Sequence, residues 1–425
     1  MNALARITQQ VTPVPLPKVV IINDSSRARG GATSLAILSA KMLVARGYDV
    51  TFVAADQGDD GELESFGIKT RILGGKKINE QSRLKSARDG MYNRDAAREL
   101  TRFIRDNDDD NTVYHLHVWA QILSPAVFDV LGEVADRTYI HAHDFFLACP
   151  NGALFNFRSK SSCTLKPASA KCLATHCDKR AYAHKLWRSA RYQSLKTHFG
   201  KDKAWAGVIS LHPEMDDRLE RGGLTNTKPT AIRNPAVPFS QSRIRAEEND
   251  VFCYVGRIEA GKGVETLCNA ARQAGVKLRV IGAVGADSSI KDRYPEVEFT
   301  GWLNREDIGQ HLQDARALVM PSEFAEPFGL VAAEASASGL PVIVSNTSMI
   351  SKDVRDDTLG LTTDVSTPEV LAASLTEMAH MASSRVKAIS ETAFKGDKAI
   401  GNTPDAWLDA LCGLYAKAVS GKVKV

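Results

Sequence analysis

The stretch PSEFAEPFGLVAAEASASGLPVIVS, residues 321–345, places a turn, a helix-like segment and a strand-like segment in direct succession. The run ALVMPS just before it reads as another strand. Pro327 stands where the helix would begin, a position that tolerates proline, and PVIVS is β-branched and apolar like a buried strand. This order predicts two parallel strands connected by a helix.

The same alternation continues on both sides of this stretch. VFCYVG, KLRVIG and VEFTG read as strands, and helix-like segments start near Gly263 and Arg305. In the first half, KVVII at residues 18–22 leads through a turn into a helix-like stretch that ends at Gly47, and VTFVA follows. VYHLHVW, TYIHAHDFF and AWAGVIS extend this first series. We therefore predict an α/β protein with two doubly wound, Rossmann-like domains facing a cleft, where ligands bind at the carboxyl ends of the strands.

The length of 425 residues also favours two domains, because single cores rarely grow beyond about 300 residues. A turn-rich stretch at residues 221–240 is the best linker. Thr403 followed by Pro404 is a good start for a final helix, which we expect to cross back to the first domain. The predicted boundaries are a disordered lead-in at 1–16, an acceptor-binding domain at 17–236, a donor-binding domain at 237–402 and the final helix at 403–425.

Composition excludes several classes of protein. Hydrophobic residues make up 44% and charged residues 24%, and no apolar run is long enough to span a bilayer. The net charge of +4 is too small to indicate a nucleic-acid partner. The N-terminal stretch has no secretion signal, so we expect a cytoplasmic protein.

The helix start near Pro327 has the features of a phosphate site. The free N–H groups at a helix N-terminus attract anions, and Gly329 would let a ligand approach the backbone closely. Glu326 and Glu334 stand eight residues apart, up to about 12 Å along a helix, which suits two groups on one extended ligand. Paired carboxylates could also be the acid and base of a glycoside hydrolase, although the helical spacing disfavours that hypothesis.

Two cations lie on the predicted turn GRIEAGKG, which follows a strand. Arg257 and Lys262 are suited to bind phosphate, because charge-assisted hydrogen bonds are among the stronger ones.

These segments carry a family resemblance. EPFGLVAAE resembles the paired-glutamate signature of the retaining GT-B glycosyltransferases of group 1, glycosyltransferase family four, and YVGRIEAGKGVETL resembles their second donor motif. The resemblance covers most of the chain and is strongest at residues 250–350. It implies retaining transfer of a sugar from a UDP- or GDP-sugar to a glycan or lipid-linked acceptor, in the synthesis of a cell-surface polysaccharide such as exopolysaccharide or lipopolysaccharide. A nucleotide-sugar epimerase and a non-catalytic nucleotide-sugar-binding protein are the alternatives.

The resemblance also implies a role for each motif residue. Arg257 and Lys262 would hold the donor diphosphate, Glu326 would bind hydroxyls of the transferred sugar, and Glu334 would bind the ribose. The implied catalytic residues are Arg257, Lys262, Glu326 and His143, and the implied donor-binding residues are Gly30, Gly31, Gly256, Phe328, Gly329, Leu330, Val331 and Glu334. No cofactor or catalytic metal is expected, because we interpret the Asp-x-Asp pattern at Asp108–Asp110 as a solvated turn.

In the first half, Gly30 and Gly31 precede a helix without the G-x-G-x-x-G spacing of dinucleotide binders, and in the resembling family this loop faces the donor phosphates. YIHAHDFFLACPNG resembles the family's HD segment. His143 is thus the candidate cleft residue, and Asp144 is expected to orient it. His115, His117 and His141 are expected to be packed core residues, as lone histidines on apolar strands usually are.

Two further features lie between residues 149 and 203. At helical spacing Lys185, Arg188, Arg191 and Lys196 share one face, which could meet anionic lipid on the inner face of the membrane or be a solvated surface. Cys149, Cys163, Cys172 and Cys177 could form a structural zinc site with His176 as an alternate ligand. Their spacing lacks the tight pairs of common zinc modules, although Cys172 and Cys177 come close, so free thiols are the other interpretation.

Overall fold

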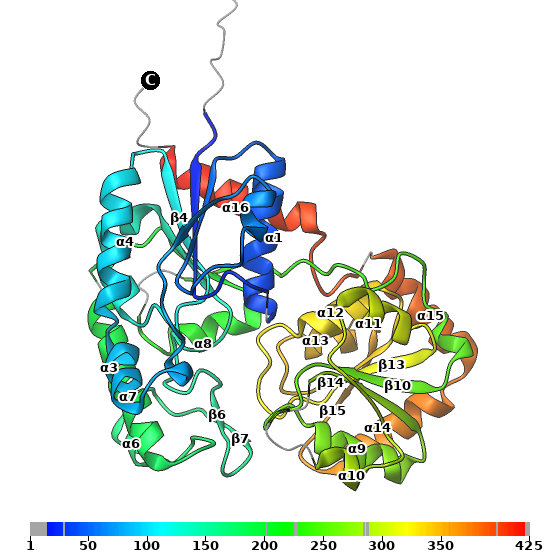
Figure 1. Cartoon of the computed structure of the whole chain (residues 1–425). Coiled ribbons are helices and arrows are strands. Elements are labelled where there is room, and N and C mark those ends of the chain that lie inside the picture. The colour runs from blue at the N-terminus through cyan, green and yellow to red at the C-terminus, as the bar shows by residue number, and fades with distance from the viewer. Residues whose placement is uncertain are drawn as a thin grey trace, which may run out of the picture.

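The computed structural model describes residues 15–28, 30–200, 202–224, 228–283, 285, 289–356, 358–396 and 398–420. These residues form two α/β domains that lie side by side (Figure 1). The predicted lead-in at 1–16 falls almost entirely outside the described residues. Within them, no helix is both long and apolar enough to cross a bilayer.

The N-terminal domain contains a parallel sheet of seven strands among the described residues, in the order β3-β2-β1-β4-β5-β8-β9. The order reverses between β1 and β4, so the loops after these two strands diverge at a switch point of the kind that binds ligands. The strands are β1 (Lys18–Asn23), β2 (Val50–Ala54), β3 (Lys69–Ile72), β4 (Thr112–Leu116), β5 (Thr138–Ala142), β8 (Gly207–Ser210) and β9 (Thr230–Ala231).

Helices cover both faces of this sheet (Figure 1). Apolar side chains of β1 alternate between two core clusters, with Val20 and Ile22 in one and Val19 and Ile21 in the other, as expected for a strand buried on both faces. The helices are α1 (Gly31–Ala45), α2 (Glu62–Ser65), α3 (Arg83–Met91), α4 (Arg94–Asn107), α5 (Ala126–Leu131), α6 (Ala170–Ala174), α7 (Tyr182–Phe199) and α8 (Asp216–Glu220).

The C-terminal domain repeats this architecture with a parallel sheet in the order β12-β11-β10-β13-β14-β15, and its switch point lies between β10 and β13. Its strands are β10 (Val251–Val255), β11 (Lys277–Ile281), β12 (Glu298–Gly301), β13 (Ala315–Met320), β14 (Val342–Ser345) and β15 (Gly360–Thr363). Its helices are α9 (Val264–Ala274), α10 (Ile290–Arg293), α11 (Arg305–His311), α12 (Leu330–Ala337), α13 (Ser351–Asp356), α14 (Pro368–His380) and α15 (Ser383–Lys395).

The chain passes between the domains twice, along neighbouring paths. Pro235 and Asn402 form a parallel β-bridge, and the next helix, α16 (Pro404–Val419), packs on the N-terminal domain. The Thr403 hydroxyl accepts the Ala406 N–H at 3.2 Å, which is the predicted N-cap. Tyr139 of β5 donates a hydrogen bond to the Leu414 carbonyl at 2.8 Å, so α16 is part of the N-terminal core.

One ion-paired cluster holds the domains together beside these crossings. Asp353 of α13 accepts hydrogen bonds from Arg233 at 2.9 and 3.0 Å, and it lies 2.8 Å from His212 after β8. Lys352 pairs with Glu214 at 2.8 Å. The first domain is therefore joined to α13 by three contacts between acidic and basic side chains.

Residues 143–181 form an irregular segment between β5 and α7 that reaches the other domain. It contains a short hairpin of β6 (Phe155–Asn156) and β7 (Ser161–Ser162), which points toward the C-terminal domain in Figure 1. Lys160 pairs with Glu323 at 3.3 Å. The Phe157 ring lies against Gly261 of the β10–α9 loop.

We predict that Trp407→Ala destabilises the protein by about 3–5 kcal/mol, because Trp407 is 0% exposed in the core that joins α16 to the first sheet. Trp302 is 74% exposed, so Trp302→Ala is the matched control and should change stability by no more than about 0.5 kcal/mol. Urea unfolding followed by far-UV circular dichroism measures both. Equal losses in the two variants would show that α16 does not contribute to the core.

Candidate active site

The loops after β10 and β13 meet at the C-terminal switch point, and an ion pair connects them. Lys262 Nζ lies 2.8 and 3.1 Å from the two carboxylate oxygens of Glu326. The Ser322 hydroxyl donates to the same carboxylate at 2.9 Å, and the Lys262 ammonium lies 4.9 Å above the Phe324 ring. The structure thus brings together two residues that the sequence placed in different motifs.

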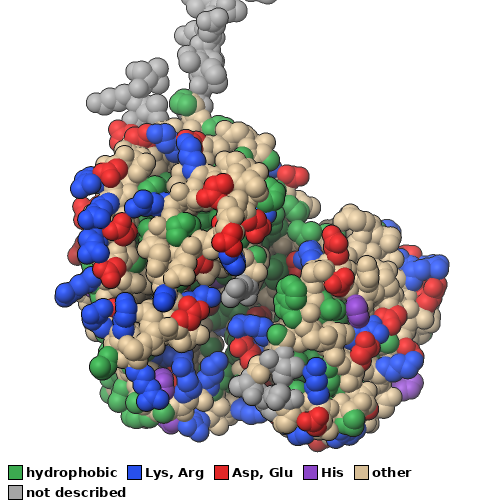
Figure 2. Space-filling model, viewed as in Figure 1, with side chains coloured by type: hydrophobic (Ala, Val, Ile, Leu, Met, Phe, Trp, Pro, Cys, Tyr) green, Lys and Arg blue, Asp and Glu red, His purple; other side chains and the backbone are tan. Residues whose placement is uncertain are grey.

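The N-terminus of α12 opens toward the cleft. Gly329 precedes it with φ 74° and ψ 53°, a left-handed conformation that favours glycine, and no side chain caps the first turn. Gly31, the first residue of α1, faces this turn across the cleft, because a Cβ there would lie 3.6 Å from Leu330 Cδ2. Figure 2 shows a groove between the two lobes with acidic and basic side chains along it. The predicted glycine loop and the predicted phosphate site therefore face each other.

Glu334, one turn further along α12, is only 7% exposed and pairs with Arg305 at 2.9 Å. Burial raises the pKa of Glu334 to about 7, and the Arg305 guanidinium opposes that rise. Arg305 also donates to the Val237 carbonyl and lies 4.7 Å from the Phe239 ring. The sequence analysis did not assign this partner, although a lone carboxylate among small residues signals that one is needed.

Arg257 pairs with a carboxylate other than Glu326 and Glu334. Its side chain is 72% exposed and pairs with Glu259 at 3.1 Å. The Arg257 carbonyl accepts a hydrogen bond from the Tyr254 hydroxyl at 2.9 Å, and a Cβ at Gly256 would lie 2.8 Å from that hydroxyl. The arginine thus lies on the loop after β10 with an exposed guanidinium.

Two polar residues that the sequence analysis did not single out organise the N-terminal switch point. The Asp24 carboxylate, directly after β1, accepts the N–H groups of Gln121, Ile122 and Leu123 at 2.6–3.0 Å. The Asn23 side chain accepts the Val118 N–H at 3.1 Å. Burial raises the pKa of Asp24 to about 6, and these N–H groups oppose the rise. The loops after β1 and β4 are therefore locked together.

His143 lies just after β5, partly buried, and its contacts differ from the prediction. Its Nε2 is 2.9 Å from Nδ1 of His117, whereas the Asp144 carboxylate accepts the Phe146 N–H at 2.8 Å. Burial lowers the pKa of His143 to about 3, so its imidazole is neutral at physiological pH. The expectation that Asp144 orients His143 is wrong, because His117 provides the hydrogen bond.

The aspartates of the Asp-x-Asp pattern lie at the amino end of β4, the edge opposite to the cleft. Asp108 pairs with Arg137 at 2.8 Å, and Asp109 pairs with Lys18 at 2.6 Å. Thr112 donates to Asp109 at 2.7 Å. These contacts fix the start of the strand.

The basic face predicted for α7 does not face solvent. Lys185 and Arg191 are buried, and Arg191 donates to the carbonyls of Gly90 and Ala120 at 2.7 and 2.9 Å. Tyr182 and Leu186, near the start of the helix, lie at the surface, whereas Tyr192, Leu195 and Phe199 further along are buried. The predicted orientation was wrong because long cationic side chains bury their stems readily when carbonyls receive their N–H groups.

Three of the four predicted cysteines, Cys149, Cys172 and Cys177, lie around the buried end of Lys185, and Cys163 lies near Cys149 and Cys177. Lys185 Nζ lies 3.2 Å from Cys172 Sγ, and neighbouring thiols hold the pKa of this lysine above its usual range against the opposing effect of burial. The Asn151 amide lies between Cys149 and Cys177, at 3.0 and 3.5 Å from their sulfurs. No disulfide is present among the cysteines, all of which are described. An ammonium group therefore lies among these sulfurs.

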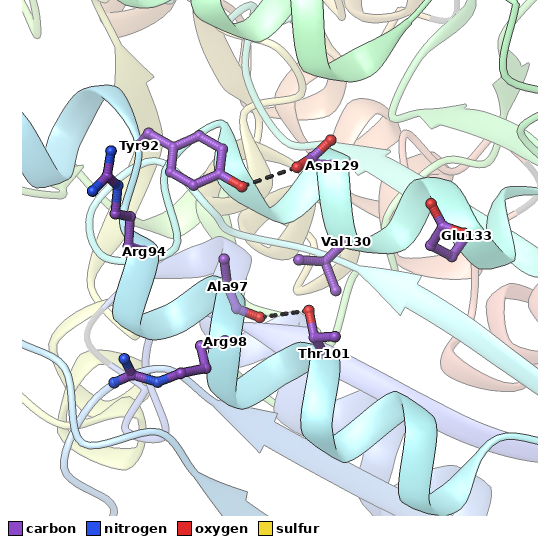
Figure 3. Close-up of a pocket in the computed structure, with 8 residues that line it drawn as sticks. All are labelled: Tyr92, Arg94, Ala97, Arg98, Thr101, Asp129, Val130 and Glu133. Carbon is purple, nitrogen blue, oxygen red and sulfur yellow. Dashed lines mark hydrogen bonds between the residues drawn. The ribbon is translucent and has the colours of Figure 1, made fainter.

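A separate hollow lies on the outer side of the N-terminal domain, between α4 and α5 (Figure 3). Its polar groups bond to one another, since Tyr92 donates to Asp129 and Thr101 donates to the Ala97 carbonyl. None of its lining residues belongs to the candidate site.

Comparison with known proteins agrees with this geometry. Residues 238–395 match the family model described as "Glycosyl transferases group 1". This chain carries a group 1 glycosyltransferase domain. The match covers the C-terminal domain, including both donor motifs, and confirms the predicted resemblance to group 1 for this domain.

Relatives and solved structures extend the comparison to the whole fold. A 41.2 kDa protein in the cps region of Klebsiella pneumoniae is 24% identical over 52% of this chain, and Mycobacterium tuberculosis glycogen synthase is 28% identical over 52%. The aligned part spans 64% and 55% of those proteins.

Sucrose-phosphate synthase of Thermosynechococcus elongatus superposes with a TM-score of 0.71 at 17% identity, covering 96% of this chain and 100% of that one. The Anabaena protein Alr3699/HepE, solved with UDP and glucose, superposes with a TM-score of 0.64 at 15% identity, covering 94% and 100%. These likenesses confirm the predicted GT-B fold.

We predict that Gly329→Ala destabilises the protein by about 1–3 kcal/mol. The left-handed backbone costs a non-glycine residue about 1–2 kcal/mol, and the new Cβ would lie 2.8 Å from the end of the Met320 side chain. Gly275→Ala is the control, because Gly275 has φ 66° but no atom within 4 Å of its Cβ position. Chemical denaturation should give the larger loss for Gly329→Ala, and equal losses would contradict the tight packing at this turn.

Proposed function

We propose that this protein transfers a sugar from a UDP- or GDP-sugar to a glycan or lipid-linked acceptor, with retention at the anomeric carbon. The observation that carries the proposal is the joining of Lys262, Glu326 and the uncapped start of α12 at one switch point. Product NMR tests the stereochemistry, and an inverted anomer would contradict retention.

The donor diphosphate would lie between the cations of the β10–α9 loop and the first turn of α12. Cleavage of the bond between the sugar and the diphosphate leaves negative charge on the phosphate, and preorganised cations and helix N–H groups stabilise such charge. Lys262 is the better-placed cation, because Glu326 already positions it. Arg257 would add its exposed guanidinium when the phosphate binds.

The two glutamates would bind the ends of the donor. Glu326, near Lys262, would accept hydroxyl hydrogens of the transferred sugar, and Glu334, beside Arg305, would accept those of the ribose. The backbones of Phe328 to Val331 would meet the phosphates. Across the cleft, Gly30 and Gly31 would border the phosphates, while His143 would face the reacting carbon with a neutral imidazole.

The acceptor would enter from the N-terminal side, in the synthesis of a cell-surface polysaccharide. The likeness to a protein of a cps region supports this setting.

We also propose a cytoplasmic location with peripheral contact to anionic membrane through residues 178–203. Exposed Lys179 and Arg180 lie beside the exposed Tyr182 and Leu186, and sedimentation with anionic vesicles tests this contact.

We predict that Lys262→Ala lowers kcat by on the order of 10²-fold while the fold stays intact, because one preorganised charge is lost from the transition state. Lys277→Ala is the matched control, since Lys277 pairs with Asp250 at the far end of the sheet. A transfer assay with the cognate nucleotide-sugar, accompanied by thermal melts, measures the effect. Turnover within about twofold of wild type in Lys262→Ala would refute its role.

Transfer should also survive EDTA, because Lys262, Arg257 and the α12 N-terminus would supply the charge that a divalent ion supplies in metal-dependent transferases. The measurement is the initial rate with and without the chelator, followed by added Mg²⁺ or Mn²⁺. A loss of activity that either ion restores would contradict the proposal and indicate that a metal ion acts at the diphosphate.

A further inference from the structure

Four histidines occupy one face of the N-terminal sheet. His115 and His117 lie on and just after β4, and His141 and His143 lie on and just after the neighbouring strand β5. Alternate residues of a strand point to the same side, so the four rings form a compact group. The ring centroids of His115 and His117 are 4.1 Å apart, and those of His117 and His141 are 5.0 Å apart.

The first three of these side chains are buried, with His115, His117 and His141 at 0–2% exposure. His115 Nδ1 lies 2.7 Å from the Tyr415 hydroxyl of α16, and His115 Nε2 lies 3.2 Å from His141 Nδ1. Nε2 of His117 and Nε2 of His141 have no hydrogen-bond partner among the described residues. A buried polar atom without a partner costs about 1–3 kcal/mol, so two of them together call for a ligand.

The three buried rings offer a set of metal ligands. One nitrogen from each of His115, His117 and His141 lies within 4.8 Å of the other two. Two nitrogens at about 2.1 Å from a tetrahedral zinc ion are about 3.4 Å apart, so a contraction of at most about 1.4 Å would close the set around an ion. Three histidine nitrogens with an open fourth position are a known zinc arrangement.

The outer contacts also suit a metal. A metal-bound histidine usually has its second ring nitrogen held by another group, which fixes the ring. Tyr415 contacts the second nitrogen of His115, and His143 contacts Nδ1 of His117. We propose that His115, His117 and His141 bind a divalent transition-metal ion, of the zinc type, in the core of the N-terminal domain.

This site does a different task from the proposed donor site, which lies in the other domain. The ion joins β4 to β5 and, through Tyr415, to α16, and it fixes the ring of His117 that holds His143. The cysteine cluster is the weaker candidate, because the Lys185 ammonium already lies 3.2 Å from Cys172 Sγ and a metal cation there would meet a like charge.

The first test is elemental analysis of the full-length protein after passage over a chelating resin. We expect about one zinc ion per chain in the wild type, and loss of the ion in His117→Gln and His141→Gln. Cys172→Ser and the exposed His184→Gln are matched controls that should keep the metal. Metal retained in both core-histidine variants, or lost in Cys172→Ser, would overturn the proposal.

A second measurement uses the wild type alone, since a core-histidine variant can fail to fold. The protein is unfolded with a chelator present, freed of metal and refolded with Co²⁺. Visible ligand-field bands without thiolate-to-cobalt charge transfer support a site made of histidines. Charge-transfer bands would assign the metal to the cysteines, and a wild type that is isolated without metal and takes up no cobalt would exclude the site. Both of these results contradict the proposal.

Discussion

The candidate site depends on the pairing of two buried or half-buried carboxylates, each of which has its own cation. Glu326 is paired with Lys262 and Glu334 with Arg305, and each pair joins the α12 segment to a different loop of the C-terminal domain. Glu334 is the more buried of the two, so loss of Arg305 would leave it as an uncompensated buried charge, which is costly. The pairs therefore hold both glutamates in fixed positions on either side of the α12 N-terminus.

The same constraint explains how the domains are arranged. α12 faces Gly31 of the first domain, and α13, which follows β14, carries Asp353 to His212 and Arg233 beside the crossing of the chain. The helices that follow the central strands of the second sheet thus provide both the proposed phosphate contact and the contact between the domains. A shift of α12 and α13 would therefore alter the cleft and the contact between the domains together.

The central strands could be predicted from the sequence, because buried parallel strands are continuous β-branched runs such as Val251–Val255. The short edge strands β9 and β15 could not, since two to four residues without such a run carry little pattern.

The two donor motifs were found because glycine and charged residues at a strand end have a direct chemical meaning. The contacts between distant residues were not found: Arg305 with Glu334, and His117 with His143, depend on which loops the fold brings together. The orientation of α7 was predicted wrongly for the same reason. The two carbonyls that accept hydrogen bonds from Arg191 belong to residues 71 and 101 positions away in the sequence.

The central claim is that a nucleoside diphosphate sugar binds between Lys262 and the start of α12. Thermal unfolding of the wild type and of Lys262→Ala against a panel of UDP- and GDP-sugars tests it most directly. A ligand at about 100 times its Kd stabilises the folded state by about 2.7 kcal/mol, so the account predicts a clear rise in Tm for at least one donor in the wild type and a much smaller rise in the variant. No rise with any member of the panel, or an equal rise in both proteins, would contradict it.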